Sequence, residues 1–259
     1  QAGAGFEPAS RETALLLNNL FLVAAAATVF LGTLYPLGLD ALTGEKISVG
    51  PPYFALTFAP IFVALLIALP FGPRLAWRRG NLHEALRVLA PAIAAALIAT
   101  LIVLLVATPR ALAAAASIGL AIWVISASVV DFVRLKRSGA TLRAGAFASA
   151  IAHAGLGITL IGVAGTTAWR SEAVEVLKPG QQLNIAGYSL RFDGVERTAA
   201  QSYFANRATI EVMSGGRTIA TMYPQVRQYP AEGQATTETA IRTNGFEDLY
   251  LALGDERGN

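Results

Sequence analysis

The sequence predicts a polytopic α-helical membrane protein, with five transmembrane helices in this chain followed by a small extracytoplasmic mainly-β domain. Its residues are 54% hydrophobic and only 14% charged, whereas soluble globular proteins have about 25% charged residues. Long uncharged runs occupy the part before Trp169, and partly alternating apolar and polar residues occupy the rest. The first part has an excess of basic residues and the second an excess of acidic ones, which favours a membrane part joined to an aqueous part over a nucleic-acid-binding protein.

Charged residues divide the apolar part into five uncharged runs. Each run is long enough to cross a hydrocarbon core of about 30 Å as a helix. We therefore expect a transmembrane region over residues 1–168, with spans at about residues 13–37, 50–72, 86–108, 111–131 and 144–168. The first ten residues lack the basic start of a signal peptide. Because the chain starts without Met and closes on "GDERGN", we expect it to be part of a longer polypeptide.

Basic residues in the connections predict the orientation, because short basic loops stay on the cytoplasmic side of a membrane. Nine basic residues lie at the connections on one side of the predicted membrane region, and only two, Lys46 and Arg110, lie on the other. The first helix should therefore start in the cytoplasm and the fifth should end outside it. The basic side is defined by Arg11, Arg74, Arg78, Arg79, Arg87, Arg134, Lys136, Arg137 and Arg143.

Residues 169–259 are expected to form one β-domain outside the membrane. The segments Tyr188–Glu196 and Ala208–Ser214 partly alternate apolar with polar residues, and "KPGQQ" and "SGG" are typical turn sequences. The segment "YPQVRQYP", with Tyr223, Arg227 and Tyr229, favours a strand with a solvated edge or else a docking surface for a partner.

Composition excludes several classes of function. With no cysteine there is no disulfide, thiolate metal site or iron–sulfur cluster in this chain. No Ser/His/Asp set falls in one compartment, and neither paired carboxylates at acid–base spacing nor a phosphate-binding glycine loop is present. The sequence therefore offers no catalytic side chains of a hydrolase, kinase or nucleotidyl enzyme.

His153 is the residue most suggestive of cofactor chemistry. It follows Arg143 by ten residues, which places it about 15 Å into its span, near the middle of the membrane. An imidazole there needs a partner, either haem iron or a hydrogen bond across a helix interface. Small residues on the same helical face would leave room for a macrocycle: Ala146, Ser149, Ala150, Gly157 and Ala164. His83, at the cytoplasmic mouth of the third span, is expected to be hydrated.

Several segments together resemble the C-terminal half of the CcmF family, the haem-lyase component of bacterial cytochrome c maturation. The resemblance runs in order along nearly the whole chain. It rests on "FEPASRETALLLNNLFLVAAAATVFLGTLYPL" (6–37), "ISVGPPYF" (47–54), "HAGLGITLIGVAG" (153–165), "MYPQVRQYP" (222–230) and "TETAIRTNGFEDLYLALG" (237–254).

The resemblance implies an inner-membrane, multi-pass protein with a periplasmic β-domain. Such proteins receive haem from the chaperone CcmE and work with CcmH to attach it by thioether bonds to the CxxCH motif of apocytochrome c. They also hold a b-type haem between two transmembrane histidines. Carried over to this chain, His153 would be one axial ligand of haem b, with Ala150 and Gly157 beside the macrocycle, and membrane lipid around it.

The chain departs from the family pattern in two ways. It has no tryptophan-rich WWD segment, because Trp77, Trp123 and Trp169 are isolated, and it has no histidine in an extracytoplasmic part. The site for incoming haem and the second axial ligand of haem b are therefore expected in an N-terminal portion of the same protein. A haem transporter, or a structural scaffold that recruits maturation partners through the β-domain, stays as the alternative.

Overall fold

The computed structural model describes residues 7–106, 112–137, 144–230 and 234–254. The chain divides into two compact units, Gln1–Arg170 and Ser171–Asn259, and each is described by itself. Arg110, Arg143, the ends of two predicted spans and the terminal residues from 255 onward lie outside the described residues.

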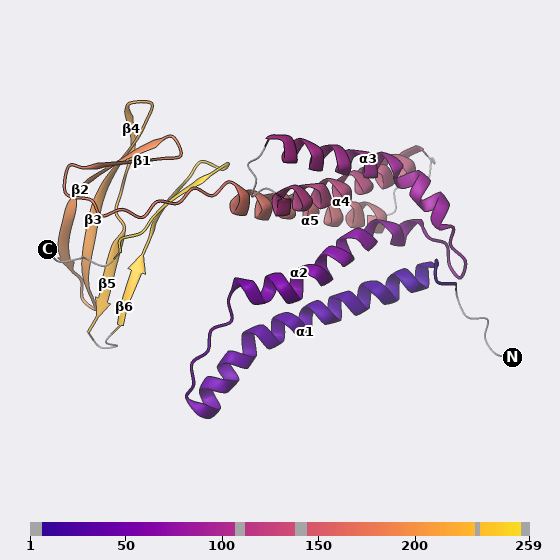
Figure 1. Ribbon diagram of the computed structural model, residues 1–259, viewed down its shortest axis with the longest axis horizontal. Coiled ribbons are helices and arrows are strands. Elements are labelled where there is room, and N and C mark those ends of the chain that lie inside the picture. Colours follow the sequence, from indigo (N-terminus) through magenta and orange to yellow (C-terminus); the bar gives the residue numbers. More distant parts are fainter. Residues whose placement is uncertain (1–6, 107–111, 138–143, 231–233, 255–259) are drawn as a thin grey trace. The chain divides into compact units, whose positions relative to one another are not determined.

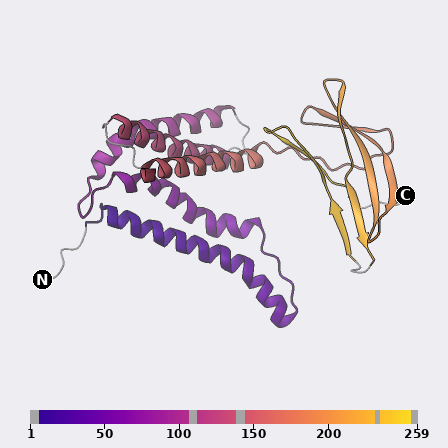
Figure 2. The same cartoon turned by 180° about the vertical axis from the view of Figure 1, so that it is seen from behind.

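The first unit is helical, as predicted. It contains α1 (Arg11–Thr43), α2 (Pro51–Ala68) continued by the 3-10 helix η1 (Leu69–Arg74), α3 (Leu82–Val106), α4 (Leu112–Arg137) and α5 (Ala144–Ala168). The described residues include 5 helices long and apolar enough to cross a membrane. In lipid the backbone must satisfy its own hydrogen bonds, and a helix does so within one segment. Figures 1 and 2 show α1 beside α2, and α3, α4 and α5 packed together.

Two helices are longer than the uncharged runs predict. Ser10 is fully buried and caps α1 by accepting a hydrogen bond from the Thr13 amide at 3.3 Å. At the other end Gly44 adopts a left-handed conformation, with φ of 72°, that closes the helix. α4 continues through Asp131 to Arg137, because a helix need not end at the first charged side chain when that side chain finds a partner.

The segment before α1 is bonded to the loop after η1. The amides of Glu7 and Gly80 donate to the carbonyls of Arg78 and Ala9, at 2.9 and 2.7 Å. The Glu12 carboxylate accepts from the Arg78 amide at 2.9 and 3.0 Å. These bonds place the start of α1 and the end of η1 at the same side of the helical unit, as the distribution of basic residues requires.

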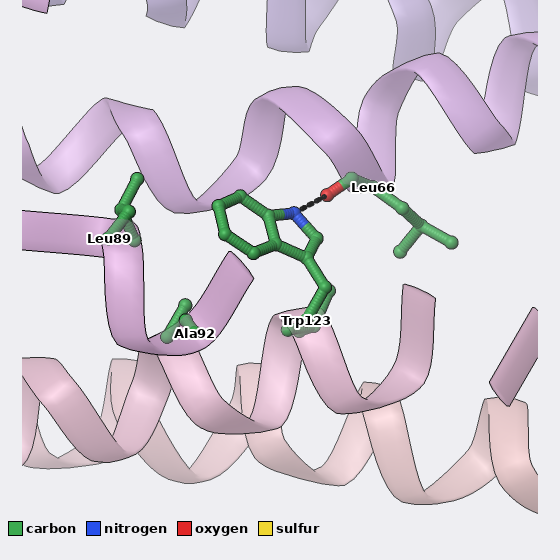
Figure 3. Packing of buried hydrophobic residues seen from close by; sticks show 6 residues of the cluster. Leu66, Leu89, Ala92 and Trp123 are labelled. Carbon is green, nitrogen blue, oxygen red and sulfur yellow. Dashed lines mark hydrogen bonds between the residues drawn. The ribbon is translucent and has the colours of Figure 1, made fainter. Parts of the chain in front are cut away.

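The buried core of the helical unit lies where α2, α3 and α4 meet. Figure 3 shows Trp123 of α4 directed toward α2, where its indole N–H donates to the Leu66 carbonyl at 3.2 Å. Leu66, Leu89, Ala92, Val124 and Ala127 complete this cluster. The indole therefore satisfies its one donor while its ring fills the core.

The second unit is antiparallel. Strands β1, β2, β3, β5 and β6 pair in that order, and β7 pairs with β8 in a separate sheet. The first half of β3 pairs with β5, and its second half pairs with β4. Leu190, Val212, Met222 and Leu251 form its buried core. The strands are β1 (Gln182–Ile185), β2 (Tyr188–Ala199), β3 (Phe204–Ser214), β4 (Arg217–Met222), β5 (Gln225–Tyr229), β6 (Gln234–Glu238), β7 (Ala240–Thr243) and β8 (Asp248–Leu251).

Both predicted strand segments are present, within β2 and β3, and the "SGG" turn joins β3 to β4. The prediction of a solvated edge in "YPQVRQYP" is wrong, because β5 pairs with β3 on one side and β6 on the other. The two sheets are connected by Tyr188, whose hydroxyl donates to Glu247 at 2.6 Å. That bond raises the pKa of the Tyr188 phenol above its ordinary value, because it stabilises the protonated form.

Packing of α3 on α4 requires Gly119, which gives a first testable prediction. A Cβ added there would lie 2.0 Å from Thr100 Oγ1. We expect Gly119→Ala to destabilise the helical unit by about 1–3 kcal/mol through overpacking, measured by thermal unfolding in detergent. Adding Thr100→Ala removes the clashing oxygen and should restore most of the loss. Gly162→Ala in α5 is the matched control, since nothing lies within 4 Å of its added Cβ.

Candidate functional site

His153 lies in the first half of α5, nine residues after its first residue Ala144, and so about 14 Å along the helix. Its side chain is half-buried. Neither ring nitrogen makes a hydrogen bond to any part of the chain that the structure describes, so the alternative of a bond across a helix interface finds no support there. An imidazole at this depth in lipid needs a polar or metal partner.

The small residues around His153 do not share one environment. Ala150 is half-buried, whereas Gly157 is buried against α4. A Cβ on Gly157 would lie 2.5 Å from Ile125 Cγ1 and 2.9 Å from the Ala121 carbonyl oxygen. The missing side chain of Gly157 therefore lets α4 and α5 approach closely. Ala146 and Ser149 are exposed, and Ala164 is buried.

A charged pair joins η1 to α4, and nothing in the sequence indicated it. Arg74, the last residue of η1, pairs with Asp131 of α4 at 2.9 Å between Nη2 and Oδ1. The Arg74 side chain is only 3% exposed and that of Asp131 is 35% exposed. Arg74 also donates to the carbonyls of Ala127, at 2.8 Å, and of Pro70. Its Nε is buried without a hydrogen-bond partner among the described residues.

Sequence reasoning counted Arg74 only as one of the basic residues that mark the cytoplasmic side, and treated Asp131 as the end of a span. Burial of an arginine would normally be signalled by an opposite charge at helical spacing. Here the two residues are 57 positions apart, on different elements. Only the packing of η1 against α4 brings them together.

On α4, Asp131 lies between the residues that contact Gly157 and Phe147, and on α5, His153 lies between those same two contacts. We refer to Arg74, Asp131 and His153, which come from η1, α4 and α5, as the Arg74–Asp131–His153 cluster. Charged groups in transmembrane segments are costly and usually serve a function. The cluster is therefore the best candidate site in this unit.

Residues at the start of α2 have structural roles. Pro51 and Pro52 begin α2, and Tyr53 and Phe54 pack on Gly32 of α1. The Tyr53 hydroxyl donates to the Thr28 carbonyl at 3.2 Å. These two aromatic rings join α1 to α2. His83 is exposed in the first turn of α3.

The β-domain has a second polar surface built from arginines stacked on aromatic rings. Arg227 lies 4.6 Å from the Tyr203 ring centroid, and Tyr203 lies 5.5 Å from Tyr229. Arg197 lies 5.6 Å from the Phe204 ring centroid. A depression of about 370 Å³ is lined by Val195, Arg197, Phe204, Asn206 and Gln228. Such a surface can contact anionic groups or a partner protein.

The donor set suits one axial position of a haem rather than a metal ion held by the chain alone. Among the described residues no group of three or more His, Cys, Asp or Glu could hold a metal ion. A single neutral imidazole is an ordinary axial ligand of haem iron. His153 meets this requirement because it is half-buried and without a hydrogen bond to the described residues.

Breaking the Arg74–Asp131 pair gives a second prediction. Arg74→Met would leave Asp131 without its main partner, at a cost of about 2 kcal/mol, less than for a fully buried pair because the carboxylate is partly exposed. The double variant Arg74→Met, Asp131→Leu should recover most of the loss, since apolar replacements of buried pairs are often neutral. Thermal unfolding in detergent measures both, and a double variant no more stable than the single one would contradict this account.

Comparisons with known proteins agree with this architecture. The family model described as the CcmF C-terminal beta-sandwich matches residues 168–259. The chain is 41% identical over 267 residues to the cytochrome c-type biogenesis protein CycK of Rhizobium meliloti, covering 99% of the chain and 40% of that protein. It is 30% identical over 251 residues to the cytochrome c-type biogenesis protein CcmF of Escherichia coli, covering 96% of the chain and 39% of that protein.

A solved structure is similar as well. The structure titled "Cytochrome c Heme Lyase CcmF" matches with a TM-score of 0.67 at 28% identity, over 92% of this chain and 39% of that one. The chain thus spans about two fifths of the length of the proteins it matches. Sequence and fold together show that this multi-pass chain belongs to the CcmF family of cytochrome c biogenesis proteins, where it corresponds to the C-terminal portion.

Proposed function

We propose that this chain is the haem-handling C-terminal portion of a membrane haem lyase, and that His153 is one axial ligand of a b-type haem. The observation that supports this best is the half-buried imidazole of His153, which lies deep in α5 without a hydrogen bond to the described residues. The relatives' names place them in cytochrome c biogenesis. The second axial ligand would come from the N-terminal portion of the same protein.

The chain's own residues would bind and orient the haem. His153 would hold the iron through one ring nitrogen, and the half-buried Ala150, one turn away, would present little bulk to the macrocycle. Close packing at Gly157 would keep α5 rigid against α4. A bound b-type haem supplies a redox-active iron that can pass single electrons. The protein's part is to set the position and potential of that iron.

The remaining steps would belong to the whole assembly. Haem delivered by CcmE would be joined to the CxxCH thiols of apocytochrome c with the help of CcmH, making the complex a holocytochrome c synthase. The β-domain would face the periplasm from the bacterial inner membrane, since the basic residues gather at the side where α1 starts. Its Arg–aromatic stacks, such as Arg227 on Tyr203, would suit docking of these partners.

Replacing the proposed ligand gives a third prediction. In a full-length CcmF-type protein that contains this sequence, His153→Ala should abolish the reduced b-type haem absorption band, because imidazole is a strong axial ligand that alanine cannot replace. His83→Ala is the matched control. It removes the other histidine of the chain, which is exposed, and should leave the band unchanged.

Two results would contradict the proposal. Retention of the full haem band in His153→Ala would remove the ligand assignment. A colourless full-length protein, reduced with dithionite and free of exogenous haem, would favour a structural scaffold in its place.

A further inference from the structure

The Arg74–Asp131–His153 cluster has more polar groups than packing of η1 against α4 requires. A salt bridge alone would do that, and two apolar side chains would do it at lower desolvation cost. Yet the Arg74 guanidinium is almost fully buried and is held by three acceptors: Asp131, Ala127 and Pro70. Arg74 therefore fixes the Asp131 carboxylate in place.

The packing of α4 on α5 places His153 and Asp131 in the same stretch of the interface between these two helices. The two helices are antiparallel neighbours: Gly157 contacts Ala121 and Ile125, while Phe147 lies 6.1 Å from Phe132 between ring centroids. His153 lies between these two contacts along α5. Side chains on a helix lean toward its N-terminus, so the imidazole is displaced toward the end of α5 that faces Asp131.

The polar atoms of the two residues are incompletely satisfied. Asp131 uses Oδ1 for Arg74, and its Oδ2 accepts no hydrogen bond from the part of the chain that the structure describes. Neither ring nitrogen of His153 makes a hydrogen bond to the described residues. Asp131 and His153 form no direct hydrogen bond with each other, and a water molecule can bridge a carboxylate and an imidazole that do not touch.

We propose that Asp131, held by Arg74, is a positioning residue for His153: it attracts the N–H of the ring nitrogen that does not face the ligand and so fixes the tautomer and orientation of the imidazole. This inference rests on the proposed function, in which the other ring nitrogen binds haem iron. Histidine ligands commonly have such a carboxylate partner, which raises their basicity. A more basic imidazole stabilises ferric over ferrous haem, and Asp131 therefore lowers the midpoint potential of the haem.

The test is a fourth prediction, made on the full-length haem-loaded protein. Asp131→Asn keeps the size and the hydrogen-bonding capacity of the side chain but removes its charge. We expect the b-type haem to remain bound, its midpoint potential to shift to a more positive value, and the g values of its low-spin ferric EPR spectrum to change. Ser128→Ala is the matched control. Ser128 is buried on α4 and donates to Val124 in its own helix at 2.8 Å, so its loss should change neither quantity.

Outcomes separate this inference from the proposed function. An Asp131→Asn protein with the potential and EPR spectrum of the unmodified protein would overturn the positioning role. If His153→Ala in the same background keeps its haem, the ligand assignment itself fails. If Asp131→Asn does not accumulate, Asp131→Glu replaces it as the test, because it keeps the charge and displaces the carboxylate by one methylene. A changed EPR spectrum in Asp131→Glu supports the proposal, and an unchanged spectrum and potential overturn it.

Discussion

The buried ion pair between Arg74 and Asp131 is the interaction on which the helical unit depends most. In a segment surrounded by lipid, a charge is stable only where an opposite charge and hydrogen-bond acceptors surround it. Arg74 obtains these from Asp131, Ala127 and Pro70. The pair thereby joins η1 to α4 beside the core of Leu66, Leu89 and Trp123, and it allows α4 to continue as a helix beyond its first acidic residue.

The same pair gives His153 an environment that a uniformly apolar bundle could not. α5 contacts α4 closely at Gly157, and its half-buried imidazole lies in the same stretch of that interface as Asp131. A rigid helix interface is the kind of support that keeps a ligand in one geometry. In the proposed function one ring nitrogen of His153 would bind the haem iron, and the N–H of the other would be oriented by the Asp131 carboxylate.

The β-domain has a different construction. Its core is small, with Leu190, Val212, Met222 and Leu251, and its arginines are used on the surface as planar groups that stack on tyrosine and phenylalanine. Several of them are also paired with carboxylates, as Arg207 is with Glu196 and Arg227 with Glu238. Such a surface is ordered before any partner arrives, which lowers the entropic cost of docking.

The sequence by itself determined the two-part organisation, the five helices and the strands within β2 and β3, because hydrophobic length and alternation are local properties. It also identified His153 as an imidazole deep in a span. It could not predict the pairing of Arg74 with Asp131, the burial of Gly157 against Ile125 or the internal position of β5. Each of these depends on which elements are neighbours in space. Contacts between residues far apart in the sequence leave no periodic signal, so only the tertiary structure decided them.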